Sequence, residues 1–242
     1  MFKRIHREFH GWLVAIIVAC IITPLAAEQP TTKLFDGTTL KGWRGDASYW
    51  SVRNGAIVGN TKPNGRQANT FLIADGDYHD FVLRVKFKLI NGASGVQFRS
   101  RPLGDPAEFH VTGYQADIGG GDTGTFYEEK GRSTLAAADA KVVRQHYKPG
   151  KWNQYEISAI GDDVVVKVNG HVTARYTETE PASKIPRAGF VALQLQAGVG
   201  MEIAFKDISI RPVNPTTAES TDSPPPFAPT SSGPKAASTL SR

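Results

Sequence analysis

Apolar and polar side chains alternate with a period of two residues through the middle of the chain. Between residues 81 and 90, every second position carries Phe, Leu or Val, and most of the positions between them are charged. This alternation is typical of a β-strand with one buried face. Further strands are predicted at 164–168, 189–196 and 201–211. In the last of these the apolar phase changes, which predicts a β-bulge near Lys206 and Asp207.

Turn residues separate these apolar runs. Asn-Gly pairs occur at 54–55, 91–92 and 169–170, and each predicts a hairpin because Asn and Gly both tolerate a positive φ. Only residues 133–144 have the composition of a short helix, and residues 119–130 are predicted to form a long surface loop. Many short antiparallel strands with almost no helix and no internal repeat favour an all-β sandwich of two antiparallel sheets, a jelly roll, over a propeller.

The two ends of the chain differ from the middle in composition. Residues 1–27 run from a basic head through an apolar stretch to small residues, the order of a signal peptide, which predicts export to the periplasm or the medium. Two alternatives stay open, a retained N-terminal membrane anchor and a lipid attached to Cys20. Residues 214–242 are rich in Pro, Ser and Thr and predict a disordered tail. The folded domain is therefore expected between residues 32 and 213.

Charge and cysteine content exclude several function classes. The net charge of +5 falls to +3 without Lys3, Arg4, Arg7 and Glu8, and no basic cluster stands out in the middle of the chain. Nucleic-acid binding is therefore not expected. The single cysteine, Cys20, leaves the folded part without a disulfide or a thiolate metal site.

Three predicted strands carry amide, guanidinium or carboxylate groups on the face opposite their apolar side chains. The polar residues are Gln97 and Arg99, Gln115 and Asp117, and Gln194 and Gln196. One interpretation is an ordinary solvated sheet face. The other is a binding face, because planar forked groups of this kind suit paired hydrogen bonds to sugar hydroxyls or to a carbonyl.

The order of short motifs along the chain resembles one known family. The motifs are LFDG at 34–37, LKGW at 40–43, WSVRNGAI at 50–57, DFVLRVKF at 80–87, SGVQFRS at 94–100, GYQADI at 113–118, YEE at 127–129, GKWN at 150–153, VNG at 168–170, ALQL at 192–195 and FKDI at 205–208. Together they are similar to the 3-keto-disaccharide hydrolase family, also described as 3-keto-glucoside lyase and 3-keto-2-hydroxy-glucal hydratase. The resemblance covers about residues 32–212 and implies a concanavalin A/LamG-like jelly roll.

The resemblance also implies an enzyme that cleaves 3-keto-glucosides. A C3 ketone acidifies the C2 proton, so that a base can remove it, the anomeric group can leave by β-elimination, and water can then add to give net hydrolysis. The enolate would be stabilised by a hard cation or by Arg and amide donors. On this basis Asp117 or Glu128 is expected to act as the base, and no metal ligand is assigned. Arg99 is expected to stabilise the enolate, and Gln97, Gln115, Gln194, Gln196, Tyr127 and Arg132 to contact the sugar.

The sequence departs from the family pattern at two places. Gln196 stands where many members have His, and Gln115 and Asp117 stand where many have Glu and Gln. The first departure favours a non-catalytic carbohydrate-binding module of the same fold. A structural or adhesive envelope protein is the third alternative.

Overall fold

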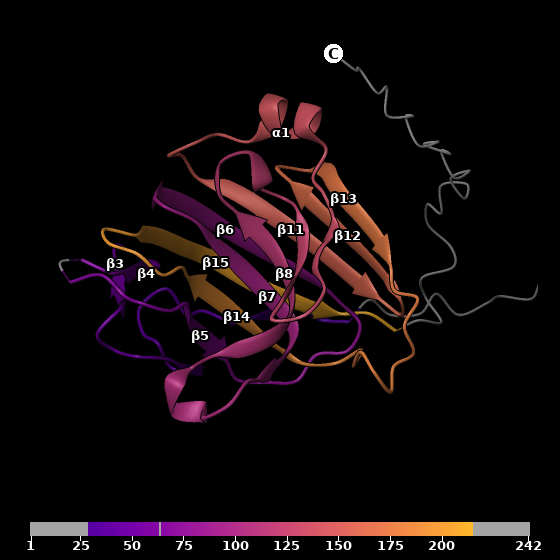
Figure 1. The fold of residues 1–242 in the computed structure, drawn as a ribbon, viewed down its shortest axis with the longest axis horizontal. Coiled ribbons are helices and arrows are strands. Elements are labelled where there is room, and N and C mark those ends of the chain that lie inside the picture. Colours follow the sequence, from indigo (N-terminus) through magenta and orange to yellow (C-terminus); the bar gives the residue numbers. More distant parts are fainter. Residues whose placement is uncertain (1–28, 63, 215–242) are drawn as a thin grey trace, which may run out of the picture.

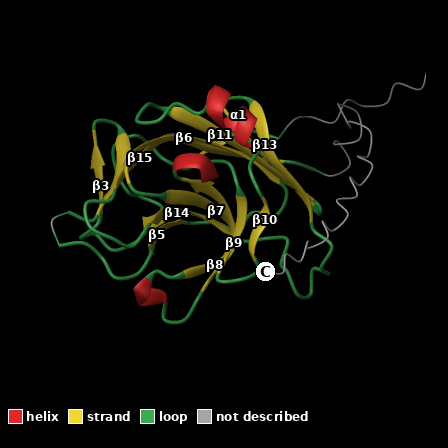
Figure 2. Cartoon of the chain, turned by 45° about the horizontal axis from the view of Figure 1, so that its top comes forward, coloured by secondary structure: helices red, strands yellow, loops and turns green. Residues whose placement is uncertain are grey.

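The computed structural model describes residues 29–62 and 64–214, and these residues form two antiparallel β-sheets stacked face to face (Figures 1 and 2). The first sheet has eight strands: β1 (Thr32–Lys33), β3 (Trp50–Arg53), β4 (Ala56–Asn60), β6 (Phe81–Asn91), β11 (Asn153–Ile160), β12 (Asp163–Val168), β13 (His171–Thr177) and β15 (Glu202–Pro212). The second has seven: β2 (Trp43–Arg44), β5 (Thr70–Ala74), β7 (Ser94–Pro102), β8 (Val111–Ile118), β9 (Phe126–Glu129), β10 (Ser133–Ala136) and β14 (Phe190–Leu195). The predicted antiparallel sandwich is therefore confirmed.

The order of strands differs from their order in the chain. The eight-stranded sheet runs β13-β12-β11-β6-β15-β4-β3, with β1 paired to β15, and the seven-stranded sheet runs β10-β9-β8-β7-β14-β5-β2. Segments distant in sequence are therefore neighbours: β7 lies between β8 and β14. This crossing places polar residues from β7, β8 and β14 on adjacent strands.

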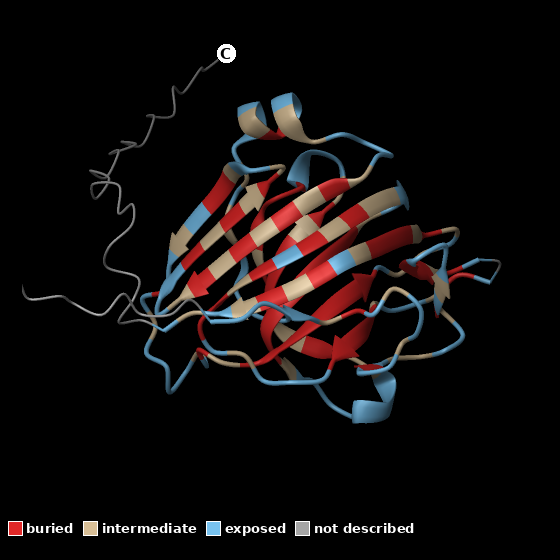
Figure 3. Ribbon diagram, turned by 180° about the vertical axis from the view of Figure 1, so that it is seen from behind, coloured by how far each residue is buried: buried red, intermediate tan, exposed pale blue. Residues whose placement is uncertain are grey.

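The main hydrophobic core lies between the two sheets. Along β6 and β11 the buried side chains alternate with partly buried or exposed ones, and Figure 3 shows these stripes on the eight-stranded sheet. The largest side chains with almost no exposed surface include Phe87, Phe98, Tyr155 and Phe205. Burying such side chains contributes about 1.5–3 kcal/mol each, so the alternation seen in the sequence is the main determinant of the sandwich.

Two of the three predicted Asn-Gly hairpins are present. Asn54 and Asn169 have φ of +51° and +50° and connect β3 to β4 and β12 to β13. The hairpin at 91–92 is wrong, because β6 and β7 belong to different sheets and the turn carries the chain from one sheet to the other. The predicted bulge in β15 is confirmed, since Asp207 has a φ of +49° and the pairing with β6 shifts register between Lys206 and Ser209.

The prediction for residues 133–144 is corrected by the structure. Residues Ser133–Ala136 form the edge strand β10, and the helix α1 spans only Ala140–His146. Its start is fixed by Asp139, whose carboxylate accepts hydrogen bonds from the backbone N–H groups of Lys141 and Val142. The three alanines at 136–138 favour a helix by composition, yet strand pairing with β9 overrides this preference for the first of them.

The predicted loop at 119–130 is also more ordered than its composition indicates. It contains the short 3₁₀ helix η2 (Gly120–Asp122) and the strand β9. A second 3₁₀ helix, η1 (Pro106–Glu108), lies between β7 and β8. No helix within the part of the chain that the structure describes is long and apolar enough to cross a membrane. The signal peptide predicted at 1–27 and, apart from Asn214, the tail predicted at 214–242 lie outside the described residues.

Candidate functional site

Four of the predicted polar residues lie on one face of the seven-stranded sheet, the face that points away from the core. Strand register sets this arrangement, because Gln97 of β7 pairs with Gln115 of β8 and with Ala192 of β14. Side chains that are opposite one another in a sheet share a face. Asp117 and Gln194 follow by the two-residue period of β8 and β14.

A chain of hydrogen bonds links these side chains and ends at Asp117. The Ser100 hydroxyl donates to Gln97 Oε1 at 2.7 Å, and Gln97 Nε2 donates to Gln115 Oε1 at 2.8 Å. Gln115 Nε2 then donates to Asp117 Oδ1 at 2.6 Å and makes a longer contact of 3.5 Å with Gln194 Oε1. Each amide is oriented by its neighbour, so the carboxylate of Asp117 is held in a fixed position.

The space in front of this chain is a cavity of about 230 Å³. It is lined mainly by polar residues: Asn69, Ser94, Gln115, Asp117, Asp122, Tyr127, Glu129, Gln194 and Gln196. Tyr127 pairs with Gln115 across β9 and β8, which brings an aromatic ring to the same face. An aromatic surface beside amides and a carboxylate suits a sugar ring, which has an apolar face and a hydroxyl rim.

Gly95 makes room for this arrangement. It pairs with Asp117 across β7 and β8, and a Cβ atom at Gly95 would lie 2.4 Å from the side-chain Cδ of Gln115. Any side chain at this position would therefore displace Gln115 from its hydrogen bond to Asp117. The sequence meets this requirement with the glycine of the SGVQ motif at 94–97.

Asp117 has the electrostatic properties of a base that works near neutral pH. Burial raises the pKa of its carboxyl to about 6, partly opposed by the hydrogen bond from Gln115, and the charges of Asp122 and Glu129 raise it further. The backbone carbonyl of Asp117 accepts a hydrogen bond from the buried Tyr155 hydroxyl, which itself accepts from the Gly124 N–H at 2.8 Å. A carboxylate with such a pKa is ionised at pH 7 and still basic enough to take a proton.

Glu129 is a further carboxylate of the cavity, beside Asp117 and Asp122, and the sequence analysis did not choose it as a site residue. Along β9, Tyr127 and Glu129 point to the cavity, so they alternate with Phe126 and Glu128. Burial raises the pKa of Glu129, against the opposing effects of Lys130 and of a hydrogen bond from Asn69. The signal for Glu129 was the two-residue period of β9, which the interpretation of residues 119–130 as a loop concealed.

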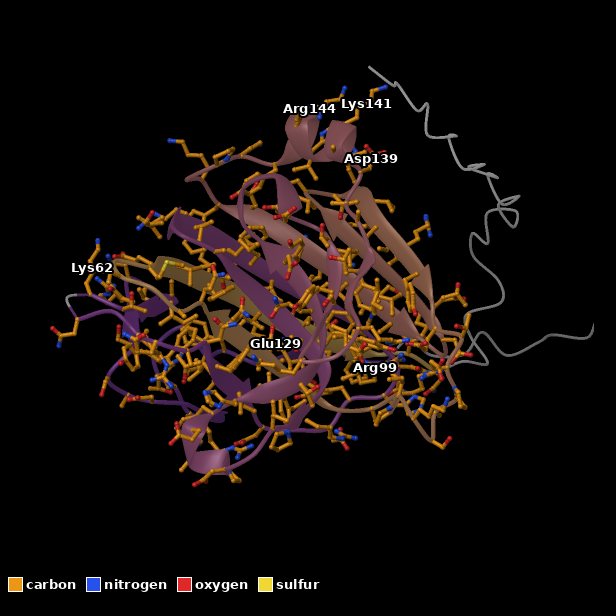
Figure 4. The ribbon with its side chains drawn as sticks, in the orientation of Figure 1. Lys62, Arg99, Glu129, Asp139, Lys141 and Arg144 are labelled. Atoms are coloured by element: carbon orange, nitrogen blue, oxygen red, sulfur yellow. The ribbon has the colours of Figure 1, made fainter. Side chains whose placement is uncertain are left out.

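Arg99 does not lie on the polar face, which corrects the prediction for this residue. It has a φ of +48°, and the pairing of β7 with β8 shifts register between Phe98 and Arg101. This bulge turns the Arg99 side chain toward the eight-stranded sheet, where it donates to Asp80 Oδ1 at 2.9 Å and to the Gly161 carbonyl at 2.8 Å. Figure 4 shows Arg99 well away from Glu129. The structure thus gives Arg99 a role in joining the two sheets.

Glu128 and Arg132 also lie away from the cavity. Glu128 pairs with Tyr114, a core residue, and therefore shares the inward face of the sheet. Its Oε2 accepts hydrogen bonds from the backbone and the guanidinium of Arg132, and Arg132 also pairs with Glu178 at 2.6 Å. Although burial opposes it, this pairing lowers the pKa of Glu178 to about 2. These charged groups lie at the edge of the sandwich, and the carboxylates that line the cavity are Asp117, Asp122 and Glu129.

Metal ligation was left open by the sequence. Within residues 29–62 and 64–214, no three His, Cys, Asp or Glu side chains come together as ligands of one ion. The chemistry below is derived from the protein's own groups.

Comparisons with known proteins identify the family and agree with the fold. The family model of the 3-keto-alpha-glucoside-1,2-lyase-like domain matches residues 30–211. A protein named as a glycosyl hydrolase from Parabacteroides distasonis superposes with a TM-score of 0.56 at 20% identity, covering 76% of this chain and 94% of the other. The carbohydrate-binding module CBM66 from Bacillus subtilis has a TM-score of 0.52 at 17% identity, with 70% and 95% covered. A Bacillus subtilis protein with a galectin-like fold has a TM-score of 0.56 at 11% identity, with 76% and 96% covered. No curated protein matches the chain.

Proposed function

Because this chain belongs to the 3-keto-alpha-glucoside-1,2-lyase-like family, we propose that it cleaves glucosides that carry a ketone at C3, with Asp117 as the base. The family and the fold place the chain among carbohydrate-active, glycosyl hydrolase-like domains. The observation that carries the finer proposal is the carboxylate of Asp117, held by Gln115 in a polar cavity with its pKa raised to about 6.

The reaction begins with proton transfer from C2 of the sugar to Asp117. Asp117 Oδ1 accepts a hydrogen bond from Gln115, and Oδ2 has no hydrogen-bond partner among the described residues. Oδ2 is therefore the oxygen that receives the proton. The electrons of the C2–H bond pass into the C3 ketone. Gln194, which lines the cavity, supplies an amide donor to the enolate oxygen.

Cleavage then follows by β-elimination. The C1–O bond breaks, a C1=C2 double bond forms, and the departing oxygen takes a proton from Glu129. Glu129 lines the cavity with Asp117, and burial raises the pKa of its carboxyl above the usual value. Addition of water, with OH to C1 and H to C2, returns a 3-keto-sugar, so that the sum of the steps is hydrolysis. Asp117 or Glu129, which both line the cavity, assists that addition.

The test is an assay of the purified protein with a 3-keto-glucoside, with and without divalent cations, following enone absorbance and the released alcohol. We expect turnover, and we expect Asp117→Asn to reduce kcat by about 10²–10⁴-fold. The matched control is Asp163→Asn, an exposed aspartate on β12 whose contact is with Thr177. Saturable binding without turnover would contradict the enzyme proposal and support a carbohydrate-binding module. Gln196 in the cavity wall favours this alternative.

We also propose that the protein acts outside the cytoplasm. The basic, apolar and small-residue segments of residues 1–27 support this location. Mass spectrometry of the protein recovered from its native host would test the proposal: a mature chain that begins near residue 28 is expected. A chain retained in the cytoplasm with its first 27 residues intact would contradict it.

A further inference from the structure

The outer face of the eight-stranded sheet, which points away from the cavity, carries a surplus of positive charge. Strand register gathers these charges, because Lys206 of β15 lies opposite Lys86 of β6 and side chains opposite one another share a face. The cations of this basic face are Arg84, Lys86, Lys88, Lys167, Arg175, Lys206 and Arg211, and its carboxylates are Glu156, Asp163, Glu202 and Asp207. No described helix lies over the sheet on this side (Figure 3).

Part of the positive charge is neutralised within the face. Glu156 lies between Arg84, at 2.8 Å, and Lys167, at 2.9 Å. The ammonium of Lys86 is 2.8 Å from the carboxylate of Asp207. Two other lysines of the face, at positions 88 and 206, form no ion pair with a carboxylate of the described residues. These two ammonium groups are therefore available to an external anion.

Lys88 and Lys206 share one aromatic neighbour. The ring centroid of Trp152, just before β11, is 4.5 Å from Lys206 Nζ and 5.6 Å from Lys88 Nζ. The indole packs on a small apolar cluster of the same face that includes Ala204. Cation–π attraction holds both ammonium groups beside the ring, and two like charges held together attract an anionic group. The arrangement thus combines a double positive charge with apolar surface.

We propose that the basic face binds an acidic polysaccharide, a polymer whose sugar rings carry carboxylate or sulfate groups, and that Lys88, Lys206 and Trp152 are its main contacts. The ammonium groups match the repeated negative charges. The indole and the aliphatic stems of the lysines offer apolar surface to the ring faces. A lipid surface fits less well, because Ile90, near the end of β6, is the single large, exposed apolar side chain that the described strands of this sheet carry.

The proposed docking leaves the cavity open. Asp117, Asp122 and Glu129 line the cavity, which lies on the outer face of the other sheet. The two outer faces of a sandwich point in opposite directions, so the acidic side of the molecule faces away from a polymer bound to the basic side. A small substrate can still reach the cavity, and the inference does not depend on the reaction proposed there.

The first test is calorimetric titration of the full-length protein with polygalacturonate and with dextran sulfate. Neutral dextran is the control polymer, and the ionic strength is about 0.15 M, at which charges more than about 8 Å apart are largely screened. We expect saturable binding to at least one acidic polymer, weakening as salt is added, and none to dextran. Binding to neither acidic polymer, or equal binding to dextran, would overturn the proposal.

The second test locates the binding on the basic face. The double variant Lys88→Ala, Lys206→Ala is expected to raise Kd about 5–30-fold, the effect of two lost ion pairs. The matched control is Lys141→Ala, Lys148→Ala, which removes the same charge from exposed positions in and just after α1 (Figure 4 shows Lys141). This control is expected to change Kd less than about twofold. Equal losses in the two double variants would mean that net charge alone matters, and would overturn the assignment.

A third variant tests the aromatic contact. Trp152→Leu keeps an apolar side chain against Ala204 and removes the ring, and is expected to raise Kd about 2–10-fold. Melting temperatures close to that of the wild type would show that this variant and the lysine variants are folded. An unchanged Kd in folded Trp152→Leu would exclude the ring from the contact.

Two further comparisons separate this inference from its alternatives. Tighter binding to vesicles of phosphatidylglycerol and phosphatidylcholine, or to single-stranded DNA, than to the acidic polysaccharides would overturn the choice of partner. Asp117→Asn should bind the polymer as the wild type does, and the Lys88, Lys206 double variant should keep the turnover of a small 3-keto-glucoside. If no variant and no wild type turns over that substrate, the proposed function fails and the titrations still decide this inference. Loss of polymer binding in Asp117→Asn would place the polymer in the cavity and overturn it.

Discussion

Replacing Asp117 by Asn should stabilise the fold while it lowers kcat. Asn keeps a side-chain oxygen that can accept the hydrogen bond from Gln115 Nε2, which is 2.6 Å from Asp117 Oδ1. The substitution therefore removes the charge and leaves the hydrogen-bond chain in place. Because burial is the main reason that the pKa of Asp117 is raised, the ionised carboxylate is destabilised in the folded state.

The size of the effect follows from the pKa. A rise from 3.8 to about 6 corresponds to about 3 kcal/mol of unfavourable ionisation, at about 1.4 kcal/mol for each pKa unit. The side chain is partly exposed, so screening by solvent reduces this to about 1–2 kcal/mol. For a domain of this size, the melting temperature of Asp117→Asn at pH 7.5 should exceed that of the wild type by about 3–6 °C.

The pH dependence gives a sharper test than the single value. A carboxyl whose pKa is raised on folding contributes stability that is fully present below the unfolded pKa and is lost as the pH rises through the folded pKa. The difference between Asp117→Asn and the wild type should therefore be near zero at pH 3.5, develop between pH 4 and 6, and stay constant above pH 7. Calorimetric melting across this range measures it, with Asp163→Asn as control. An equal or lower melting temperature for Asp117→Asn at pH 7.5 would refute the reasoning.

Three further predictions follow from the same contacts. The kcat/KM of the wild type should fall as the pH drops below about 6, because the base must be ionised, and a pH–rate profile would show this acid limb. Gly95→Ala should displace Gln115, lower kcat about tenfold and move the acid limb to higher pH, since the hydrogen bond that it breaks lowers the pKa of Asp117. An unchanged acid limb would contradict this. Arg99→Met leaves the buried Asp80 carboxylate without its guanidinium, and should cost about 2–4 kcal/mol in urea unfolding while KM stays unchanged. A raised KM in the folded variant would indicate that Arg99 contacts the substrate after all.

The two-residue period accounts for what the sequence predicted correctly. Wherever a strand is regular, its polar face follows from the apolar one, and this was enough to bring Gln97, Gln115, Asp117 and Gln194 together. The failure at Arg99 has a local cause, since a positive φ at a non-glycine residue reverses the side chain and no sequence pattern marks it. One irregular residue thus moved a predicted site residue to the other side of the sheet.

The rest of the site depends on tertiary contacts. Asn69 lies on the segment that comes just before β5, and only the packing of that segment on the outer face of the sheet brings it to the cavity. Glu129 was concealed for a different reason, because β9 has four residues and follows a glycine-rich stretch. A strand of this length shows too few alternations for the period to be recognised.

The bulge at Arg99 also bears on the proposed role of Asp117 as the base. If β7 were regular, the guanidinium would lie on the polar face with Gln97, and a nearby positive charge lowers the pKa of a carboxyl. The bulge directs Arg99 to Asp80 and the Gly161 carbonyl instead, and Ser100 takes its place beside Gln97. The hydrogen-bond chain that reaches Asp117 consists of neutral hydroxyl and amide groups, which orient the carboxylate without a full countercharge. The bulge at Arg99, which the sequence pattern does not predict, thus keeps the pKa of Asp117 near the pH at which a base is most effective.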